Sequence, residues 1–187
     1  MTRHVAQALA LSVALTLAAV AQQPSTQDKP LDVKSSVGDL HVGKDADART
    51  AGLPTYPGAR PKHEDNDDPL NFALLTESVG LKLAVAKYES DDSAAKVIAF
   101  YRDKMKKYGK VLECRALEHD GDVEVHDSQD PSGSKELKCD ENSGFVTELK
   151  AGTEADQHVV AIEPRENAKG SSFTIVYIYK RDKKGDL

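Results

Sequence analysis

Apolar and polar residues alternate over several short stretches of the chain, which is the pattern of half-buried β-strands. The stretch 81–89 places three aliphatic side chains on one face and Lys82 on the other. The stretch 173–180 is the strongest, because β-branched and aromatic residues occupy both of its faces. Weaker runs of the same kind predict further strands at 72–75, 110–117, 135–139, 145–151 and 158–163.

One stretch, from about Ser93 to Tyr108, has apolar residues at helical spacing. The preceding Ser90-Asp91-Asp92 offers capping side chains and negative charge, which suit the start of a helix. Lysines occupy the last turn and Gly109 follows, as is typical of a helix end. The sequence therefore predicts one principal helix over this range, with Val97, Ile98, Tyr101, Met105 and Tyr108 on its apolar face.

Strands and helices do not alternate along the chain, so a doubly wound parallel sheet is not expected. The predicted fold class is α+β, with an antiparallel sheet of about five to seven strands and one principal helix packed on one face. Aromatic side chains are expected in the core where that helix meets the sheet. The four tyrosines expected there are Tyr101, Tyr108, Tyr177 and Tyr179.

The first residues carry the features of a cleavable signal peptide. Arg3 and His4 precede an apolar run of about 13 residues, and a small-residue site ends at Ala21. The run is shorter than the roughly 20 residues of a membrane span, so export to a bacterial periplasm or the medium is expected, without membrane attachment after cleavage. The predicted organisation is a signal peptide (1–21), a disordered leader (22–30), a small β-hairpin with a linker (31–53), an α+β domain (54–182) and a tail (183–187). The pattern leaves open whether the hairpin packs on the domain.

Charge and cysteine usage narrow the picture further. The chain has 25 basic and 31 acidic residues, a net charge of −6, which disfavours nucleic acid and anionic membrane surfaces as partners. Its two cysteines, Cys114 and Cys139, are expected to form a disulfide in an oxidising compartment. In the chain-entropy view, closing a loop of about 25 residues stabilises the fold by roughly 3–4 kcal/mol.

A cluster at 118–127 is the strongest candidate for chemistry, because imidazoles and carboxylates are common ligands of divalent metals. Its spacing matches neither a helical ligand pair nor a calcium-binding loop, and a solvated acidic loop is the competing interpretation. The candidate metal ligands are His119, Asp122, Glu124 and His126.

No catalytic residues and no cofactor are assigned from the sequence. It contains no G-x-S-x-G motif, and the junction before the helix is acidic, which disfavours phosphate binding. His158 begins an apolar strand, where a histidine that bonds to the backbone is commoner than one that orients a serine.

Several motifs between 31 and 109 resemble those of a group of uncharacterised bacterial exported proteins. The motifs are Tyr56-Pro57-Gly58-Ala59, a strand that ends near Tyr88-Glu89-Ser90-Asp91, a helix with Phe100-Tyr101-Arg102, and the upstream stretch 37–43. In that group a Y-P-G-A turn precedes a strand and a helix with an F-Y-R-like segment. The resemblance implies a related fold and export, and it implies no activity and no site residues.

Two functional hypotheses follow. The first is a non-enzymatic periplasmic or secreted binding module that binds a protein or a small ligand through its sheet face, with a purely structural envelope component as a variant. It predicts an exposed apolar patch on the part of the sheet that one helix leaves uncovered. The alternative is a divalent-metal-binding protein or metal-dependent enzyme that uses the 118–127 cluster.

Overall fold

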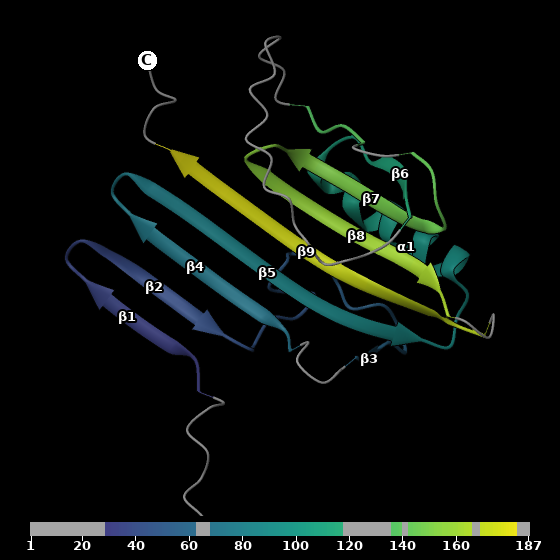
Figure 1. The fold of residues 1–187 in the computed structure, drawn as a ribbon, viewed down its shortest axis with the longest axis horizontal. Helices are drawn as coiled ribbons and strands as arrows, with labels where there is room; N and C mark the ends of the chain where they lie inside the picture. The colour runs from purple at the N-terminus through teal and green to yellow at the C-terminus, as the bar shows by residue number, and fades with distance from the viewer. Residues whose placement is uncertain (1–28, 63–67, 118–135, 140–141, 166–168, 183–187) are drawn as a thin grey trace, which may run out of the picture.

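The computed structural model describes residues 29–62, 68–117, 136–139, 142–165 and 169–182. These residues form a nine-stranded antiparallel sheet in the order β1-β2-β4-β5-β9-β8-β7-β6, with the short β3 paired to β5 (Figure 1). The strands are β1 (Leu31–Ser35), β2 (Gly38–Gly43), β3 (Arg60–Pro61), β4 (Leu70–Thr76), β5 (Val79–Ser90), β6 (Leu112–Ala116), β7 (Val146–Thr153), β8 (Asp156–Pro164) and β9 (Ser171–Asp182).

The sheet is larger than the predicted five to seven strands. The hairpin of β1 and β2 extends it, because β2 pairs with β4 from Gly38–Thr76 to Gly43–Asn71. Strand β3 has two residues, which is too short to show any alternation. Periodicity identifies a strand and its faces but carries no information on its partner, so the hairpin could not be joined to the sheet in advance.

The expected strand at 135–139 is also wrong within the described residues 136–139, where only Glu136 makes an isolated bridge, to Thr153. Strand β6 pairs with β7 instead. The disulfide between Cys114 and Cys139 is present, with the two Cα atoms 5.5 Å apart. A disulfide needs close Cα atoms but no hydrogen-bonded ladder, so it can tie an irregular segment to a strand.

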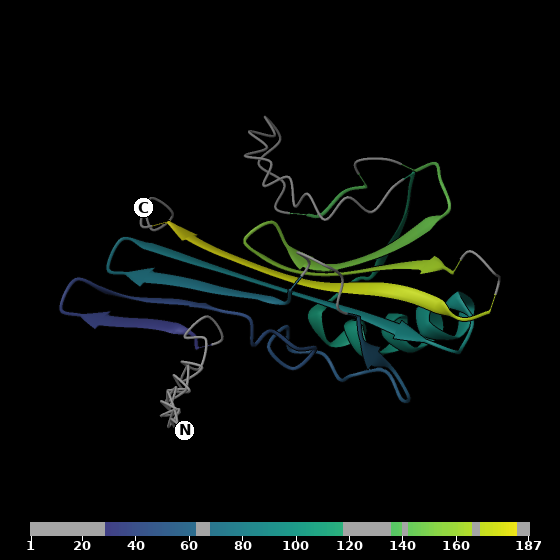
Figure 2. The ribbon, with the colours of Figure 1, turned by 60° about the horizontal axis from the view of Figure 1, so that its bottom comes forward.

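Helix α1 (Ala94–Met105) and the 3₁₀ turn η2 (Lys106–Tyr108) together span the predicted helix. Figure 2 shows α1 under the end of the sheet formed by β7, β8 and β9. Its buried side chains pack on the sheet core of Leu149, Val160 and Ile175. The N-cap is Ser93, which makes no side-chain cap bond, so the capping role expected of residues 90–92 is wrong. The helix-side faces of the strands and α1 supply the buried residues Val97, Tyr101 and Met105, together with Ala86, Tyr88, Ile162 and Phe173.

None of the helices in the described part of the chain has the length and apolar composition of a membrane span.

The sheet changes polarity beyond the helix. Strands β1, β2, β4 and the adjoining half of β5 form a wing that α1 does not reach (Figures 1 and 2). Strand register places Asp32, His41 and Lys82 on the helix side of this wing. The opposite face is apolar and partly exposed, and it carries Leu31, Val33, Leu40, Val42, Leu70, Phe72, Leu74, Leu81, Leu83 and Val85.

Candidate functional site

A cleft of about 560 Å³ lies between residues 44–54 and the helix side of the wing. Its volume is within the range of small-molecule sites. Strands from both halves of the sheet supply its floor, while Arg49 and neighbouring loop residues supply the opposite wall. The polar side chains that line it are His41, Arg49, Asn71, Lys82, Asp156 and His158.

The cleft is hollow because short side chains occupy its floor. Ala73 on β4 and Ala84 on β5 face the helix side of the sheet, where longer side chains would fill the space. Lys82 lies opposite Ala73, and Tyr177 lies opposite Ala84. Small residues in the middle and long residues at the border are what a pocket on a sheet face requires.

The loop wall is fixed to the sheet by hydrogen bonds to its backbone. His158 Nδ1 bonds to the carbonyl of Ala51 at 2.9 Å, and Tyr108 Oη donates to the carbonyl of Gly52 at 2.6 Å. Lys107 Nζ donates to the same carbonyl at 2.7 Å. Gly52 has a φ of +72°, and a Cβ there would collide with the Tyr108 hydroxyl. The wall is therefore held in one position rather than hinged.

His158 lies between two tyrosines. Its ring stacks on Tyr108 at a centroid distance of 3.5 Å and lies 4.9 Å from the ring of Tyr177. Burial lowers the pKa of His158, so the ring is neutral near pH 7. Because a carbonyl oxygen only accepts, Nδ1 carries the hydrogen and Nε2 keeps its lone pair. The expected backbone bond of this histidine is confirmed.

Tyr177 and Asp156 form a polar pair beside His158. Burial, together with the nearby Asp156 carboxylate, raises the pKa of Tyr177 to about 12. The phenol therefore stays protonated and donates its hydrogen bond to Asp156. Asp156 Oδ1 lies 3.8 Å from His158 Nε2, and its side chain is half-exposed. The pair offers oxygen acceptors at the floor of the cleft.

Two basic side chains lie on the cleft. Lys82 Nζ lies 5.8 Å above the ring of Tyr179. Arg49 is 84% exposed and pairs with Asp47 at 2.8 Å. Among the described lining residues, Asp156 is the one acidic side chain, although the whole chain is acidic. Asp47 balances the charge of Arg49, so Lys82 and Asp156 are the remaining fully charged side chains of the described lining.

His41 stands at the far end of the cleft between two carboxylates. Its Nδ1 lies 2.8 Å from Asp32, and its Nε2 lies 3.2 Å from Asp45. The hydrogen bond to Asp32 raises the pKa of His41, and Asp45 adds to the effect against the opposing influence of burial. Asn71 Nδ2 also donates to Asp45 at 3.2 Å. When His41 is protonated, both ring nitrogens can donate, and the residue ties the hairpin to the loop.

The four tyrosines expected in the core have different places. Tyr101, on α1, is fully buried, and its hydroxyl accepts a hydrogen bond from the backbone N–H of Tyr56 at 3.2 Å. Tyr108 and Tyr177 enclose His158, and Tyr179 lies under Lys82. Three of the four therefore belong to the cleft or its border.

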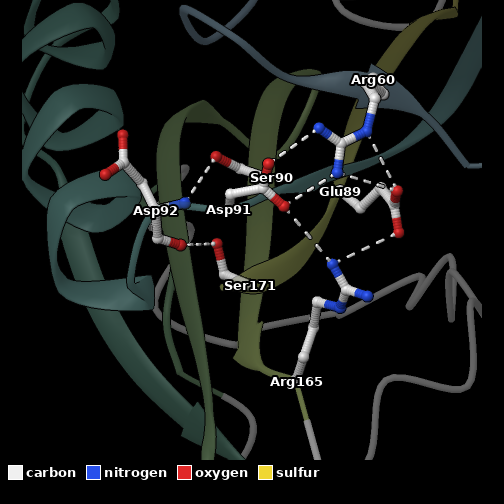
Figure 3. Close-up of polar contacts among 7 residues, drawn as sticks. All are labelled: Arg60, Glu89, Ser90, Asp91, Asp92, Arg165 and Ser171. Carbon is white, nitrogen blue, oxygen red and sulfur yellow. Dashed lines mark hydrogen bonds and ion pairs between the residues drawn. The ribbon is translucent and has the colours of Figure 1, made fainter. Parts of the chain in front are cut away.

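A second polar cluster joins β3 to the corner between β5 and α1 (Figure 3). Arg60 donates two hydrogen bonds to Asp91, at 3.0 and 2.9 Å, and one to Glu89 at 3.2 Å. Arg165 lies 3.7 Å from Glu89 and 3.9 Å from Asp91. The Arg60 guanidinium lowers the pKa of Asp91, which stays ionised. Carboxylates neutralise both guanidinium groups, so this cluster fixes a corner of the fold.

The Tyr56-Pro57-Gly58-Ala59 segment is a tight turn. Ala59 N donates to Tyr56 O at 3.0 Å, and Gly58 has a φ of +75°, as a type II turn requires after proline. Tyr56 Oη donates to the carboxylate of Asp92 at 2.9 Å. Asp92 is one of the residues drawn in Figure 3. The role of this motif here is structural.

The predicted metal ligands His119, Asp122, Glu124 and His126 lie outside the described residues. Within the part of the chain that the structure describes, no group of three or more histidine, cysteine or acidic side chains is arranged to hold a metal ion.

Sequence reasoning missed the cleft. Its lining comes from five strands, one loop and the η2 turn, which are far apart in sequence, and no spacing rule joins His41, Lys82 and His158. Lys82 alternates with aliphatic residues, as expected on the solvent side of a half-buried strand, so it gave no signal of a cleft. Comparisons with protein-family models, with curated proteins and with solved structures found no match.

Proposed function

We propose that the protein is an exported, non-enzymatic binding module whose cleft holds a small organic anion that carries a carboxylate and a hydroxyl group. The observation that carries the proposal is the position of Lys82 on a ligand-sized cleft in an otherwise acidic chain. An acidic surface repels anions in general, so a lysine that reaches into a cavity favours binding of an anion there.

The floor of the cleft sets the size of the ligand. Across the sheet, Lys82 on β5 and Asp156 on β8 lie in one row and are separated by two strand spacings, roughly 10 Å, and His158 lies two residues further along β8. A carboxylate would pair with Lys82, while a hydroxyl at the other end would donate to His158 Nε2 or Asp156. Ala84 and Tyr177 between them would contact the carbon skeleton.

The chemical state of these groups supports recognition rather than turnover. His158 uses Nδ1 to hold the loop, and Tyr177 stays protonated at physiological pH. Groups held in one protonation state serve well as fixed donors and acceptors. The divalent-metal alternative at 118–127 stays a prediction.

The apolar face of the wing supports the wider hypothesis of binding through the sheet. Leu31 is 56% exposed, Val33 45% and Leu70 37% on this face. Soluble proteins seldom expose a contiguous apolar surface without a use for it.

Isothermal titration of the exported protein with malate and citrate, and with malamide as the uncharged analogue, tests the proposal. We expect the acids to bind and the amide not to bind. Lys82→Met should weaken binding at least about tenfold, because a hydrogen bond to a charged group is worth about 1.5–3 kcal/mol. The matched control is Lys180→Met, which makes the same charge change on the opposite face of the sheet.

Two results would refute the proposal. One is the absence of heat and of any shift in melting temperature with every acid at millimolar concentration. The other is equal affinity of the Lys82→Met and Lys180→Met variants, which would show that the acid does not bind in the cleft.

A further inference from the structure

Among the described residues, strand β1 is one of the two edges of the sheet, and β6 is the other. Figure 1 shows β1 as an outermost strand, and all five of its residues are exposed. An exposed edge presents unpaired N–H and C=O groups to any second strand. We infer that β1 is a self-association edge, and that two copies of the chain pair their β1 strands antiparallel about a twofold axis at Val33.

The backbone restricts the registers that such a pairing can use. Two residues, Ser36 and Val37, connect β1 to β2, so the flanking pair Ser35–Gly38 is hydrogen-bonded and the bonded pairs alternate from there. Residues 31, 33 and 35 therefore direct their backbone groups to β2. Asp32 and Lys34 direct theirs outward. In an antiparallel dimer the outward residues must face outward residues, so the twofold axis lies at residue 32, 33 or 34.

Charge selects one of these three registers. With the axis at Val33, Asp32 of each copy faces Lys34 of the other, so both cross-strand pairs have opposite charges. With the axis at 32, two aspartates face each other, and with the axis at 34, two lysines do. Opposite charges across strands stabilise pairing and like charges oppose it.

Strand length selects the same register. The axis at Val33 pairs the complete strand, Leu31 with Ser35 and Asp32 with Lys34. The axis at 32 would place Pro30, which has no N–H, opposite Lys34 and would lose a hydrogen bond. The axis at 34 would pair Asp32 with Ser36, which belongs to the turn.

Side-chain positions agree with this arrangement. Asp32 Oδ1 accepts from His41 of its own chain, and its side chain is 57% exposed, which leaves an oxygen for the partner's lysine. Val33, 45% exposed, would contact the partner's Val33 in the close, non-hydrogen-bonded position. A lone lysine on an edge strand opposes the addition of another strand. Here Lys34 is two residues from Asp32, so the edge is complementary in charge to a second copy of itself. The dimer is isologous and closed.

Paired charge exchange tests the inference. Asp32→Lys gives an edge with two lysines, and Lys34→Asp gives an edge with two aspartates. Each variant should raise its own homodimer dissociation constant by about tenfold, since two pairs become like-charged. An equimolar mixture should form a heterodimer with near wild-type affinity, because each lysine again faces an aspartate. Native mass spectrometry and sedimentation equilibrium of the exported protein measure both.

The mixture separates pairing from damage to the hairpin. Each substitution disturbs contacts within its own chain, with His41 or with Asp39, and mixing two damaged hairpins would not restore association. Lys34→Pro is a second, charge-independent variant, because it removes an outward N–H that the fold itself does not use. It should abolish the dimer and leave the circular dichroism spectrum unchanged.

A wild-type chain that sediments as a monomer at about 100 µM would overturn the inference, because even small, transient interfaces associate at that concentration. A mixture that stays monomeric while the wild type dimerises would overturn the register. No residue of β1 lines the cleft, so the Lys34→Pro result is independent of acid binding, whereas Asp32→Lys also removes a bond to the cleft residue His41.

Discussion

At the scale of single residues, the two histidines of the cleft stabilise the fold in opposite pH ranges. Hydrogen bonding to Asp32 raises the pKa of His41, so the folded state holds a proton more tightly than the unfolded chain. Its contribution is complete below a pH of about 6.5 and is lost as the pH rises through the folded pKa. Burial lowers the pKa of His158, so its contribution is present above about 6.5 and is lost as the pH falls.

Glutamine substitutions would separate these effects. We expect His41→Gln to lower the free energy of unfolding most at pH 5.5, which is about one unit below the ordinary histidine pKa. The loss should become progressively smaller above pH 7. His158→Gln should cost most at pH 8, about 1–3 kcal/mol from the lost hydrogen bond and stacking, and less toward acid pH. Urea denaturation at several pH values measures both. The same pH slope for the two variants would contradict the assignment.

At the scale of elements, the sequence predicted what is periodic and local. The principal helix and the strands β4 to β9 follow from residue spacing, and the ends differ by a few residues. The buried side of β5 does not follow, because its aliphatic face is partly exposed while Ala84 and Ala86 face the helix side. The place of β2 beside β4 could not be predicted, because many apolar strands could occupy that position. The cleft shares this limit, since Ala73 and Ala84 become a floor only when β4, β5 and β9 are in register.

Two glycines in local turns allow an element-scale prediction. Gly58 has a φ of +75° with open space around a possible Cβ, whereas a Cβ at Gly52 would meet the Tyr108 hydroxyl. Gly58→Ala should therefore cost only backbone strain, about 1–2 kcal/mol. Gly52→Ala should cost more, because the Tyr108 clamp must also move.

Thermal denaturation of the two alanine variants provides the comparison. Gly58→Asn serves as a control, because asparagine adopts the left-handed conformation more easily and should recover part of the loss. A Gly52→Ala variant as stable as Gly58→Ala would show that the 44–54 loop is not clamped as the hydrogen bonds indicate.

At the scale of the whole molecule, the disulfide and the cleft lie on opposite faces of the sheet. Cys114 lies on β6 at one edge, and the cleft spans β2 to β8. Cys114 shares its face with Glu148, while the cleft is on the face of His158. Stability and binding can therefore be changed independently.

Replacing both cysteines by alanine tests that independence. The loss of the bridge should lower the free energy of unfolding by roughly 3 kcal/mol, since it frees a loop of 25 residues in the unfolded chain. Acid binding in the cleft should keep its affinity, because neither cysteine and no residue of β6 lines the cleft. Urea denaturation and isothermal titration on the same preparation measure the two quantities. A large loss of affinity in a variant that is still folded at the assay temperature would mean that the sheet transmits strain from β6 to β8, and the sheet would then act as one mechanical unit rather than as two halves.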